Sequence, residues 1–199
     1  MDNDRAEYEK LKYETEDFEN HITVHWGNRG AEHKGNKYPA TYSIDKEYKI
    51  LSFFKEMVKF DGGSVLEVGP GRGKFANLLF ENYPITSYTV LDLKKNFVDS
   101  EELLGNKAIY VESKDYEQVW NKPYDLFVST FVISETPLYY KDNIYEHIIP
   151  NCKTVFIVDG DINHDFNNEM IKMMQKNFSN ATYKDSGMHS SMVITGSKL

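Results

Sequence analysis

Apolar positions along this chain fall into two patterns: short continuous runs, and longer stretches in which apolar residues recur with helical spacing. The short runs predict buried strands, because a strand covered on both faces is apolar throughout. These strands are expected over about 64–69, 87–92, 108–112, 125–130 and 153–159. Helices are expected over about 43–60, 73–82, 94–104, 115–120, 137–148 and 165–178. This alternation predicts an α/β fold with a parallel sheet and helices on both faces.

Local signals indicate where the first helix begins and ends. Ser43 is a typical N-cap residue, and Gly62-Gly63 is a typical stop. The helix is expected to bury an apolar stripe made of Ile44, Tyr48, Leu51, Phe54 and Val58. A later helix is expected to begin at Thr136-Pro137, with threonine as the cap and proline at the first helical position.

Two further strands close the chain, over about 180–184 and 190–196. The sequence Asp185-Ser186-Gly187 between them is typical of a turn. The pair is therefore expected to form an antiparallel hairpin, which brings the predicted sheet to seven strands.

The most specific signal lies between the first strand and the helix that follows it. The run reads Ser64-Val65-Leu66-Glu67-Val68-Gly69-Pro70-Gly71-Arg72-Gly73-Lys74. Glycines at every second position allow positive φ and close approach of the backbone to a ligand. The helix start behind them offers free N–H groups. Such a turn typically holds a nucleoside-containing cofactor at the carboxyl edge of a parallel sheet.

Two common nucleotide-binding motifs do not fit this turn. The dinucleotide fingerprint G-x-G-x-x-G requires a third glycine where this chain has Lys74. The phosphate-binding motif G-x-x-x-x-G-K-[ST] is also absent. Glu67 instead places an acid at the strand end, which favours a cationic or hydrogen-bond-donating ligand.

The pattern Glu67-x-Gly69-x-Gly71-x-Gly73 resembles motif I of the class I S-adenosylmethionine-dependent methyltransferases. The resemblance implies that Glu67 and the turn Gly69-Pro70-Gly71-x-Gly73 contact the methionine part of S-adenosyl-L-methionine. It also implies a Rossmann-like methyltransferase fold with a mostly parallel seven-stranded sheet and a C-terminal antiparallel hairpin. The similarity covers about residues 44–199.

Further cofactor contacts are expected at the ends of the next strands. Asp92 ends the second strand about 20 residues after the first glycine, the usual spacing of an acid that binds ribose hydroxyls. The resemblance implies this role for Asp92, with Leu93 beside it. It also implies an adenine contact after the third strand, and the alignment leaves Ser113 and Asp115 open. Ser129 and Thr130, at the end of the fourth strand, are then expected to face the sulfonium and the acceptor.

A longer run refines the class of acceptor. The segment Asp125–Thr136 is similar to the D-L-x-I-N-x-x-S-x-x-E-M run of a group of sugar O-methyltransferases, and the tyrosine-rich helix after it is also similar. The chain departs from that run at Ser129, where the group has asparagine, and at Thr136, where it has methionine. This similarity implies methyl transfer to the hydroxyl of a sugar or a related small polar molecule.

A hydroxyl acceptor needs a general base, because a neutral hydroxyl is a poor nucleophile. The candidates are His25 in the N-terminal segment, Glu135 after the fourth strand and Asp159 at the end of the fifth. Other histidines and an acid stay open as alternatives: His21, His33, Asp161, His164 and His189. No metal site is expected, because Ser129 stands where related magnesium-dependent enzymes have an acidic ligand.

Composition narrows the partners. The chain has 199 residues, a net charge of −8 and no basic block, which argues against a nucleic-acid substrate. Cys152 is the single cysteine, and no apolar run approaches membrane-spanning length. A cytoplasmic location and a small-molecule substrate are therefore expected, with no membrane partner. The sequence leaves open whether the chain forms a homo-oligomer.

The chain is expected to comprise an acidic N-terminal segment and lid over residues 1–43 and a methyltransferase domain over residues 44–199. Two alternatives to an O-methyltransferase stay open. One is a non-catalytic nucleoside-binding protein with the same fold, since a fold does not fix a function. The other is an enzyme that transfers a methyl or aminopropyl group to a small amine.

Overall fold

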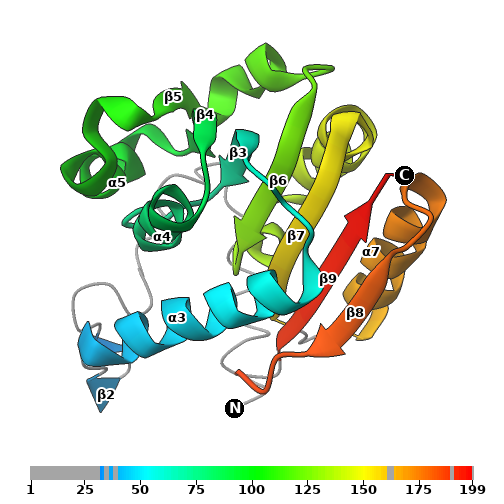
Figure 1. The fold of residues 1–199 in the computed structure, drawn as a ribbon, viewed down its shortest axis with the longest axis horizontal. Helices are drawn as coiled ribbons and strands as arrows, with labels where there is room; N and C mark the ends of the chain where they lie inside the picture. Colours follow the sequence, from blue (N-terminus) through cyan, green and yellow to red (C-terminus); the bar gives the residue numbers. More distant parts are fainter. Residues whose placement is uncertain (1–31, 34–35, 38–39, 161–163, 189–190, 199) are drawn as a thin grey trace.

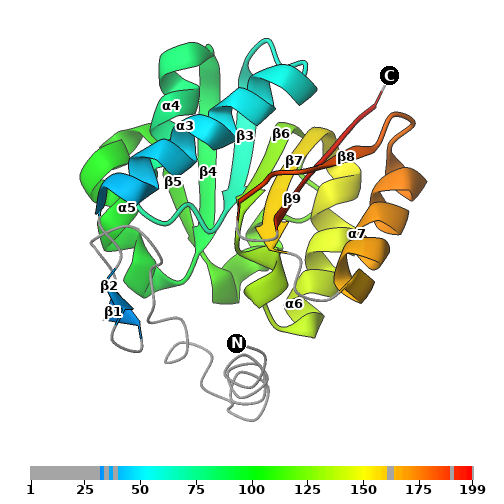
Figure 2. The ribbon, with the colours of Figure 1, turned by 90° about the horizontal axis from the view of Figure 1, so that it is seen from below.

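A seven-stranded sheet forms the centre of the protein, with strand order β5-β4-β3-β6-β7-β9-β8 (Figure 1). The computed structural model describes residues 32–33, 36–37, 40–160, 164–188 and 191–198. Helices cover both faces of the sheet, as the sequence predicted (Figure 2). A separate antiparallel pair, β1 (Glu32–His33) and β2 (Asn36–Lys37), precedes the first described helix.

Five neighbouring strands of the sheet pair in parallel, and of the last two strands one reverses direction. The parallel strands are β3 (Gly63–Val68), β4 (Ile85–Asp92), β5 (Ile109–Glu112), β6 (Tyr124–Thr130) and β7 (Cys152–Gly160). The reversed strand is β9 (Ser191–Ser197), whereas the edge strand β8 (Thr182–Asp185) runs in the same direction as β7. β9 pairs antiparallel with both β7 and β8, so the predicted C-terminal hairpin is confirmed.

The described helices fall into two groups, one on each face of the sheet. α3 (Ala40–Met57), α4 (Lys74–Asn82) and α5 (Phe97–Leu104) contribute to one apolar core. α6 (Leu138–Asn143) and α7 (His164–Asn177) contribute to the other. Short turns of 3-10 or π type link them: η1 (Lys94–Asn96), η2 (Gly105–Lys107), η3 (Ser113–Val119), η4 (Ile133–Glu135), η5 (Ile144–Ile148) and η6 (Ile149–Asn151). Among the described helices, none is both long and apolar enough to cross a membrane.

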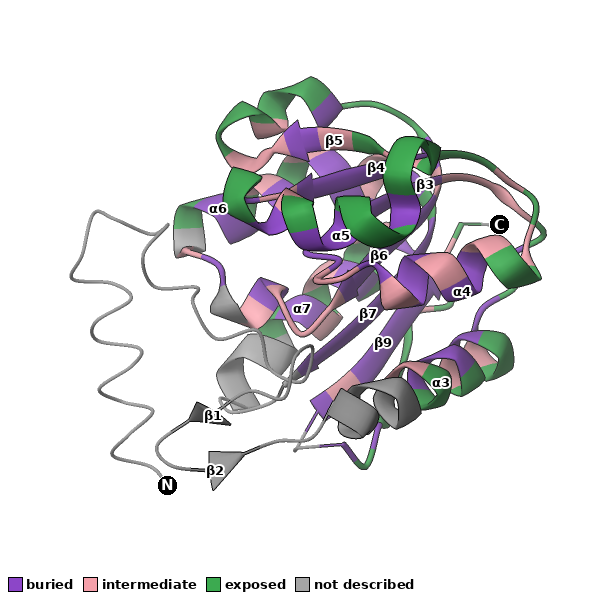
Figure 3. Ribbon diagram, turned by 90° about the vertical axis from the view of Figure 1, so that its left-hand side faces the viewer, coloured by how far each residue is buried: buried purple, intermediate pink, exposed green. Residues whose placement is uncertain are grey.

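The central strands are buried on both sides, as their continuous apolar sequences require (Figure 3). Successive side chains of β3 alternate between the two cores. Val65 packs in the core under α3 and α4, whereas Leu66 and Val68 pack in the core under α6 and α7. Glu67 lies between these two apolar neighbours and therefore shares the face of Val65. An acid thus stands on the α3 and α4 face of the central strand.

The first predicted helix, over about 43–60, corresponds to α3 but differs from it in its first residue and in its buried face. α3 begins at Ala40 instead of being capped by Ser43, and it includes residues on both sides of the expected boundary at residue 44. Tyr48 is 56% exposed, although it was expected in the apolar stripe, and Ile50 is fully buried instead. The reason is the orientation of α3 on the sheet, which turns Ile50 and Phe54 inward together.

The long helix expected over 137–148 is interrupted. α6 begins at Leu138, with Pro137 as its N-cap and not its first residue. The hydroxyl of Thr136 donates to the carbonyl of Ile133, 2.8 Å away, and so closes η4 instead of capping α6. The π turn η5 and the 3-10 turn η6 then replace the rest of the α-helix. Similarly, the segment expected as a helix over 115–120 is the 3-10 turn η3.

Candidate cofactor site

The turn after β3 adopts a backbone that favours glycine at three positions. Gly69, Gly71 and Gly73 have φ angles of 69°, 57° and 73°, all in the left-handed region. The N–H of Gly69 donates to the carbonyl of Leu91 on β4, at 3.0 Å, and the N–H of Gly73 donates to the carbonyl of buried Pro70, at 2.9 Å. Gly73 is the N-cap of α4. The predicted strand, glycine turn and helix start are confirmed.

Neighbouring side chains pack closely against the first and third glycines. A Cβ on Gly69 would lie 2.3 Å from a methyl carbon of Val132, in the loop after β6. A Cβ on Gly73 would lie 2.9 Å from the side chain of Leu104, at the end of α5. Real Cβ atoms essentially never show distances this short, so a side chain at either position would force Val132 or Leu104 to move. The loop after β6 therefore lies directly against the glycine turn.

Glu67 has an unusual environment for an acid. Its side chain is 0% exposed, and its Oε2 accepts a hydrogen bond from the hydroxyl of Tyr88, at 2.7 Å. Its Oε1 is buried without a hydrogen-bond partner. Burial raises the pKa of Glu67 to about 8; the Tyr88 hydrogen bond opposes this shift, whereas the nearby Glu47 and Asp92 add to it. A buried oxygen without a partner is costly, and such groups are enriched at ligand sites.

Asp92 ends β4, next to the strand that carries the glycine turn. Its Oδ1 accepts hydrogen bonds from the backbone N–H of Leu93, at 2.7 Å, and from Nδ2 of Asn96, at 2.8 Å. These two donors fix the direction of a half-buried carboxylate at the carboxyl edge of the sheet. Leu93 itself is buried, with 5% exposure.

The two candidates for the adenine contact lie at the start of η3 and differ in exposure. Ser113 is half-buried, whereas Asp115 is exposed. Burial raises the pKa of Tyr140 on α6, and the nearby side chain of Ser113 opposes this shift. Ser113 therefore points toward the same interior as Tyr140, beneath α6.

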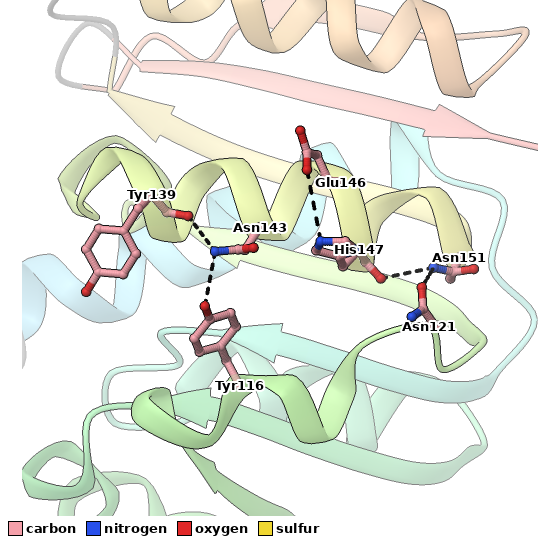
Figure 4. A network of polar contacts seen from close by, with 7 residues as sticks. All are labelled: Tyr116, Asn121, Tyr139, Asn143, Glu146, His147 and Asn151. Atoms are coloured by element: carbon pink, nitrogen blue, oxygen red, sulfur yellow. Dashed lines mark hydrogen bonds and ion pairs between the residues drawn. The ribbon is translucent and has the colours of Figure 1, made fainter.

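Polar contacts, shown in Figure 4, and one aromatic contact hold η3 and the residues after it against α6 and η5. Nδ2 of Asn143 donates to the hydroxyl of Tyr116, at 3.1 Å, and to the carbonyl of Tyr139, at 2.7 Å. The rings of Trp120 and His147 lie 4.4 Å apart between centroids. The segment that follows β5 is therefore fixed by side chains on the segment that follows β6.

The end of β6 carries two further predicted residues. Ser129 is fully buried, and its Oγ has no hydrogen-bond partner, whereas Thr130 is half-buried. The next residue, Phe131, has a φ of 59°, and its N–H donates to the carbonyl of Val158, at 2.6 Å. A left-handed backbone at a bulky residue is strained, and such strain concentrates at functional sites.

The three candidate bases have different positions. Asp159, near the end of β7, is 1% exposed; its Oδ2 accepts from the N–H of Ser134, at 2.8 Å, and its Oδ1 accepts from the Ser134 hydroxyl. Glu135 is the last residue of η4, and its side chain lies outside what the structure describes. His25 also lies outside the described residues, as do His21, Asp161 and His189. Within the described part of the chain, no three His, Cys, Asp or Glu side chains are grouped to hold a metal ion.

Sequence reasoning did not identify Tyr88, Glu47 or Val132, which surround the predicted residues. Tyr88 lies on β4 opposite Val65, on the same face of the sheet as Glu67. Side chains alternate between the two faces along each strand, and this alternation could in principle pair Tyr88 with Glu67. The pairing can be made only when the register between β3 and β4 is known. Val132 had no sequence signal, because its contact with Gly69 depends on how the loop after β6 turns.

This architecture is the fold of the class I S-adenosylmethionine-dependent methyltransferases. A candidate O-methyltransferase from Nostoc punctiforme superposes with a TM-score of 0.62 at 13% identity, over 80% of this chain and 58% of that one. Human N-acetylserotonin methyltransferase in complex with SAM gives 0.58 at 15% identity, over 80% and 53%. The mitomycin 7-O-methyltransferase MmcR gives 0.60 at 14% identity, over 96% and 60%.

The similarity is one of three-dimensional structure. No protein-family model and no curated protein sequence matches the chain. The chain spans between about half and three fifths of the length of the three methyltransferases named above. The fold and the site geometry therefore carry the functional argument.

Proposed function

We propose that this chain is an S-adenosyl-L-methionine-dependent methyltransferase that acts on a hydroxyl group of a small polar acceptor. The observation that carries this proposal is the juxtaposition of the buried Glu67, the left-handed glycine turn and the oriented Asp92 on two adjacent strands. They lie beside the point where the strand order reverses, between β3 and β6. Ligands of open α/β sheets bind outside the carboxyl ends of the strands at such a point.

Each part of the site matches one part of the cofactor. The cationic amino group of the methionine moiety suits Glu67, and its carboxylate suits the backbone N–H groups of the turn Gly69–Gly73. Asp92, with Leu93 beside it, suits the ribose hydroxyls. Ser113 is a better adenine contact than Asp115, because it is the less exposed of the two.

The bound cofactor supplies an activated methyl group, so the protein's task is to align the acceptor. Alignment of two reactants can contribute about 7–11 kcal/mol to lowering a barrier. Ser129 and Thr130 end the strand nearest the expected acceptor position. Both oxygens of Asp159 accept hydrogen bonds from Ser134, which suits a group that fixes the loop. His25 and Glu135 are therefore the first bases to test.

Two observations support oxygen as the acceptor atom and a sugar or related metabolite as the molecule. The segment Asp125–Thr136, similar to a run in sugar O-methyltransferases, forms β6 and the loop at the carboxyl edge. A candidate O-methyltransferase and the mitomycin 7-O-methyltransferase MmcR share this fold.

The buried free thiol of Cys152 is consistent with the reducing cytoplasm.

Binding is tested first, by titration calorimetry with S-adenosylhomocysteine. The wild-type chain is expected to bind, and Asp92→Ala is expected to raise Kd about 10–100-fold through loss of a charged hydrogen-bond acceptor. Gly71→Trp is expected to abolish binding, because a side chain there fills the turn. Glu117→Ala, an exposed acid of η3, is the matched control and should leave Kd unchanged. No heat with the wild type would overturn the proposal.

Turnover is tested next, with S-adenosylmethionine and a library of sugars, other alcohols and small amines. The proposal predicts S-adenosylhomocysteine together with a methylated hydroxyl product, identified by mass spectrometry. Methylthioadenosine as the co-product would indicate aminopropyl transfer instead. Tight binding without turnover of any acceptor would indicate a non-catalytic nucleoside-binding protein.

A further inference from the structure

Glu67 is enclosed from every side in the described structure. It lies in the interior of the sheet, on the face covered by α3 and α4, and none of its surface is exposed. One carboxyl oxygen receives the hydroxyl of Tyr88, a side chain that is itself 1% exposed. The other oxygen has no hydrogen-bond partner. A carboxylate in this position is shielded from bulk solvent and has one protein donor, so its charge is poorly stabilised.

The groups that face Glu67 make its charge still less favourable. Glu47 approaches from α3 and Asp92 from the end of β4, and both are acids. Tyr88, also on β4, is a neutral hydrogen-bond donor whose own pKa is raised by burial and by Glu67. Burial, the two acids and the single neutral donor together favour the protonated form of Glu67 at neutral pH.

We infer that binding of the cofactor's cationic α-amino group releases one proton from Glu67, and that Tyr88 positions the resulting carboxylate. This inference rests on the proposed function, because it requires that the cofactor occupy this site. Beyond the proposed function, cofactor affinity then depends on pH through Glu67. Tyr88 contributes to binding without touching the ligand.

The proton balance is simple. In the protein without ligand, Glu67 is a neutral carboxylic acid. When the ammonium group of the ligand comes to face Oε1, the O–H bond of the acid breaks and the proton passes to solvent. Oε2 keeps the hydroxyl of Tyr88 as its donor. Because the bound state holds one proton fewer, affinity is expected to rise about tenfold per pH unit below pH 8 and to stop rising near pH 8, where Glu67 becomes fully ionised and the ligand's own ammonium group begins to lose its proton.

The test is calorimetry with S-adenosylhomocysteine between pH 6.0 and 7.5, in phosphate and in imidazole buffers. The difference in apparent enthalpy between buffers gives the number of protons released, which is expected to be near one. 5′-Methylthioadenosine, which lacks the amino-acid part, is the matched control ligand. It is expected to release no proton and to bind with an affinity that does not change with pH.

Three variants give separate readouts. Glu67→Gln has the shape of the protonated acid, so it should fold, release no proton and bind with weak, pH-independent affinity. Tyr88→Phe removes the donor that favours the carboxylate, so the pH at which affinity levels off should move upward. Glu47→Gln removes a repelling acid, so that pH should move downward. A merely structural role of Tyr88 would change unfolding temperature without moving the pH profile.

The possible failures are distinguishable. If S-adenosylhomocysteine binds with the same enthalpy in both buffers, the proton release is overturned and the proposed cofactor stands. If Glu67→Gln keeps the pH dependence of the wild type, the assignment of the proton to Glu67 is overturned. If neither S-adenosylhomocysteine nor S-adenosylmethionine binds at any pH, the proposed function itself fails.

Discussion

Two carboxyl groups, one near the carboxyl ends and one near the amino ends of the central strands, have opposite electrostatic environments. Glu67, near the carboxyl end of β3, is fully buried, and burial raises its pKa to about 8. Asp125, near the amino end of the neighbouring β6, accepts hydrogen bonds from Nζ of Lys153 at 2.6 Å and from the N–H and hydroxyl of Ser64, both at 2.8 Å. These contacts, led by the one from Lys153, lower its pKa to about 2.

The difference separates an edge that stabilises the fold from an edge prepared for a ligand. Asp125 joins the start of β3 to the start of β6 and to β7. Its single negative charge is balanced by Lys153 and by the hydrogen bonds from Ser64. Glu67 lacks such matching, so its ionised form would destabilise the fold until a cation arrives. A site that keeps an unsatisfied group ready for its ligand costs stability, which is a common feature of functional sites.

The largest expected effect comes from a substitution in the glycine turn after β3, where the cofactor is expected to bind. Gly69→Ala should destabilise the protein by about 2–5 kcal/mol, because it combines left-handed strain with a clash against Val132. Gly187→Ala is the control, since Gly187 has a φ of 61° but only Nζ of Lys49 near its Cβ, at an ordinary contact distance of 3.5 Å, and it should cost only about 1 kcal/mol. Urea unfolding measures both. Equal losses would show that the contact with Val132 is unimportant.

Glu67→Gln should make the protein without ligand more stable at high pH while weakening cofactor binding. The folded-state pKa of Glu67 lies above its unfolded value, so its contribution to stability is complete below about pH 4.5 and is lost as pH rises to about 8. The variant escapes this loss, and its advantage should reach on the order of 2–4 kcal/mol at pH 8.5. Urea unfolding of both proteins between pH 5 and 8.5 should show the curves converging toward pH 5.

Asp125→Asn, at the amino ends of the strands, should have the opposite effect and lower stability at neutral pH. The folded-state pKa of Asp125 lies below its unfolded value, so its contribution to stability is present above about pH 4 and is lost as pH falls to about 2. The variant should therefore lose about 1–2 kcal/mol at pH 7 and progressively less below pH 4. Cofactor affinity should not change. A pH-independent loss would contradict the assigned ionic role.

The smallest expected effect concerns the network that links η3 to α6. Asn143→Ala removes the hydrogen bonds to Tyr116 and to the Tyr139 carbonyl and should cost about 1 kcal/mol. Asn77→Ala, which removes an exposed bond to Glu81 within α4, is the control and should cost only a few tenths. Thermal unfolding measures both. Asn143→Ala should also weaken binding of adenosine analogues, because η3 carries Ser113.

Much of the ligand edge could be predicted from the sequence because its constraints are local. Glycines at three left-handed positions and acids at the ends of two buried strands are signals that residue type and spacing express directly. The same reasoning fails for Phe131, which adopts a left-handed backbone without being a glycine. Its conformation is imposed by the hydrogen bond to Val158 on β7, a contact distant in sequence.

Other parts depended on packing that no local pattern records. After α6 the chain continues as the π turn η5 and the 3-10 turn η6, although the sequence has the periodicity of an α-helix there. The partnership of Glu67 with Tyr88 needs the register of β3 on β4. The hydrogen bonds of Asp159 to Ser134 likewise need the position of η4 over the end of β7. Sequence reasoning therefore identified individual residues more reliably than the contacts between them.

The antiparallel strand β9 has a consequence for how the protein is made. It is inserted between β7 and β8, so β7 has no partner on that side until residues 191–197 have left the ribosome. An open strand edge of this kind pairs readily with other chains. During translation, the nearly finished domain would expose that edge, and chaperone dependence or aggregation at high expression is the expected result.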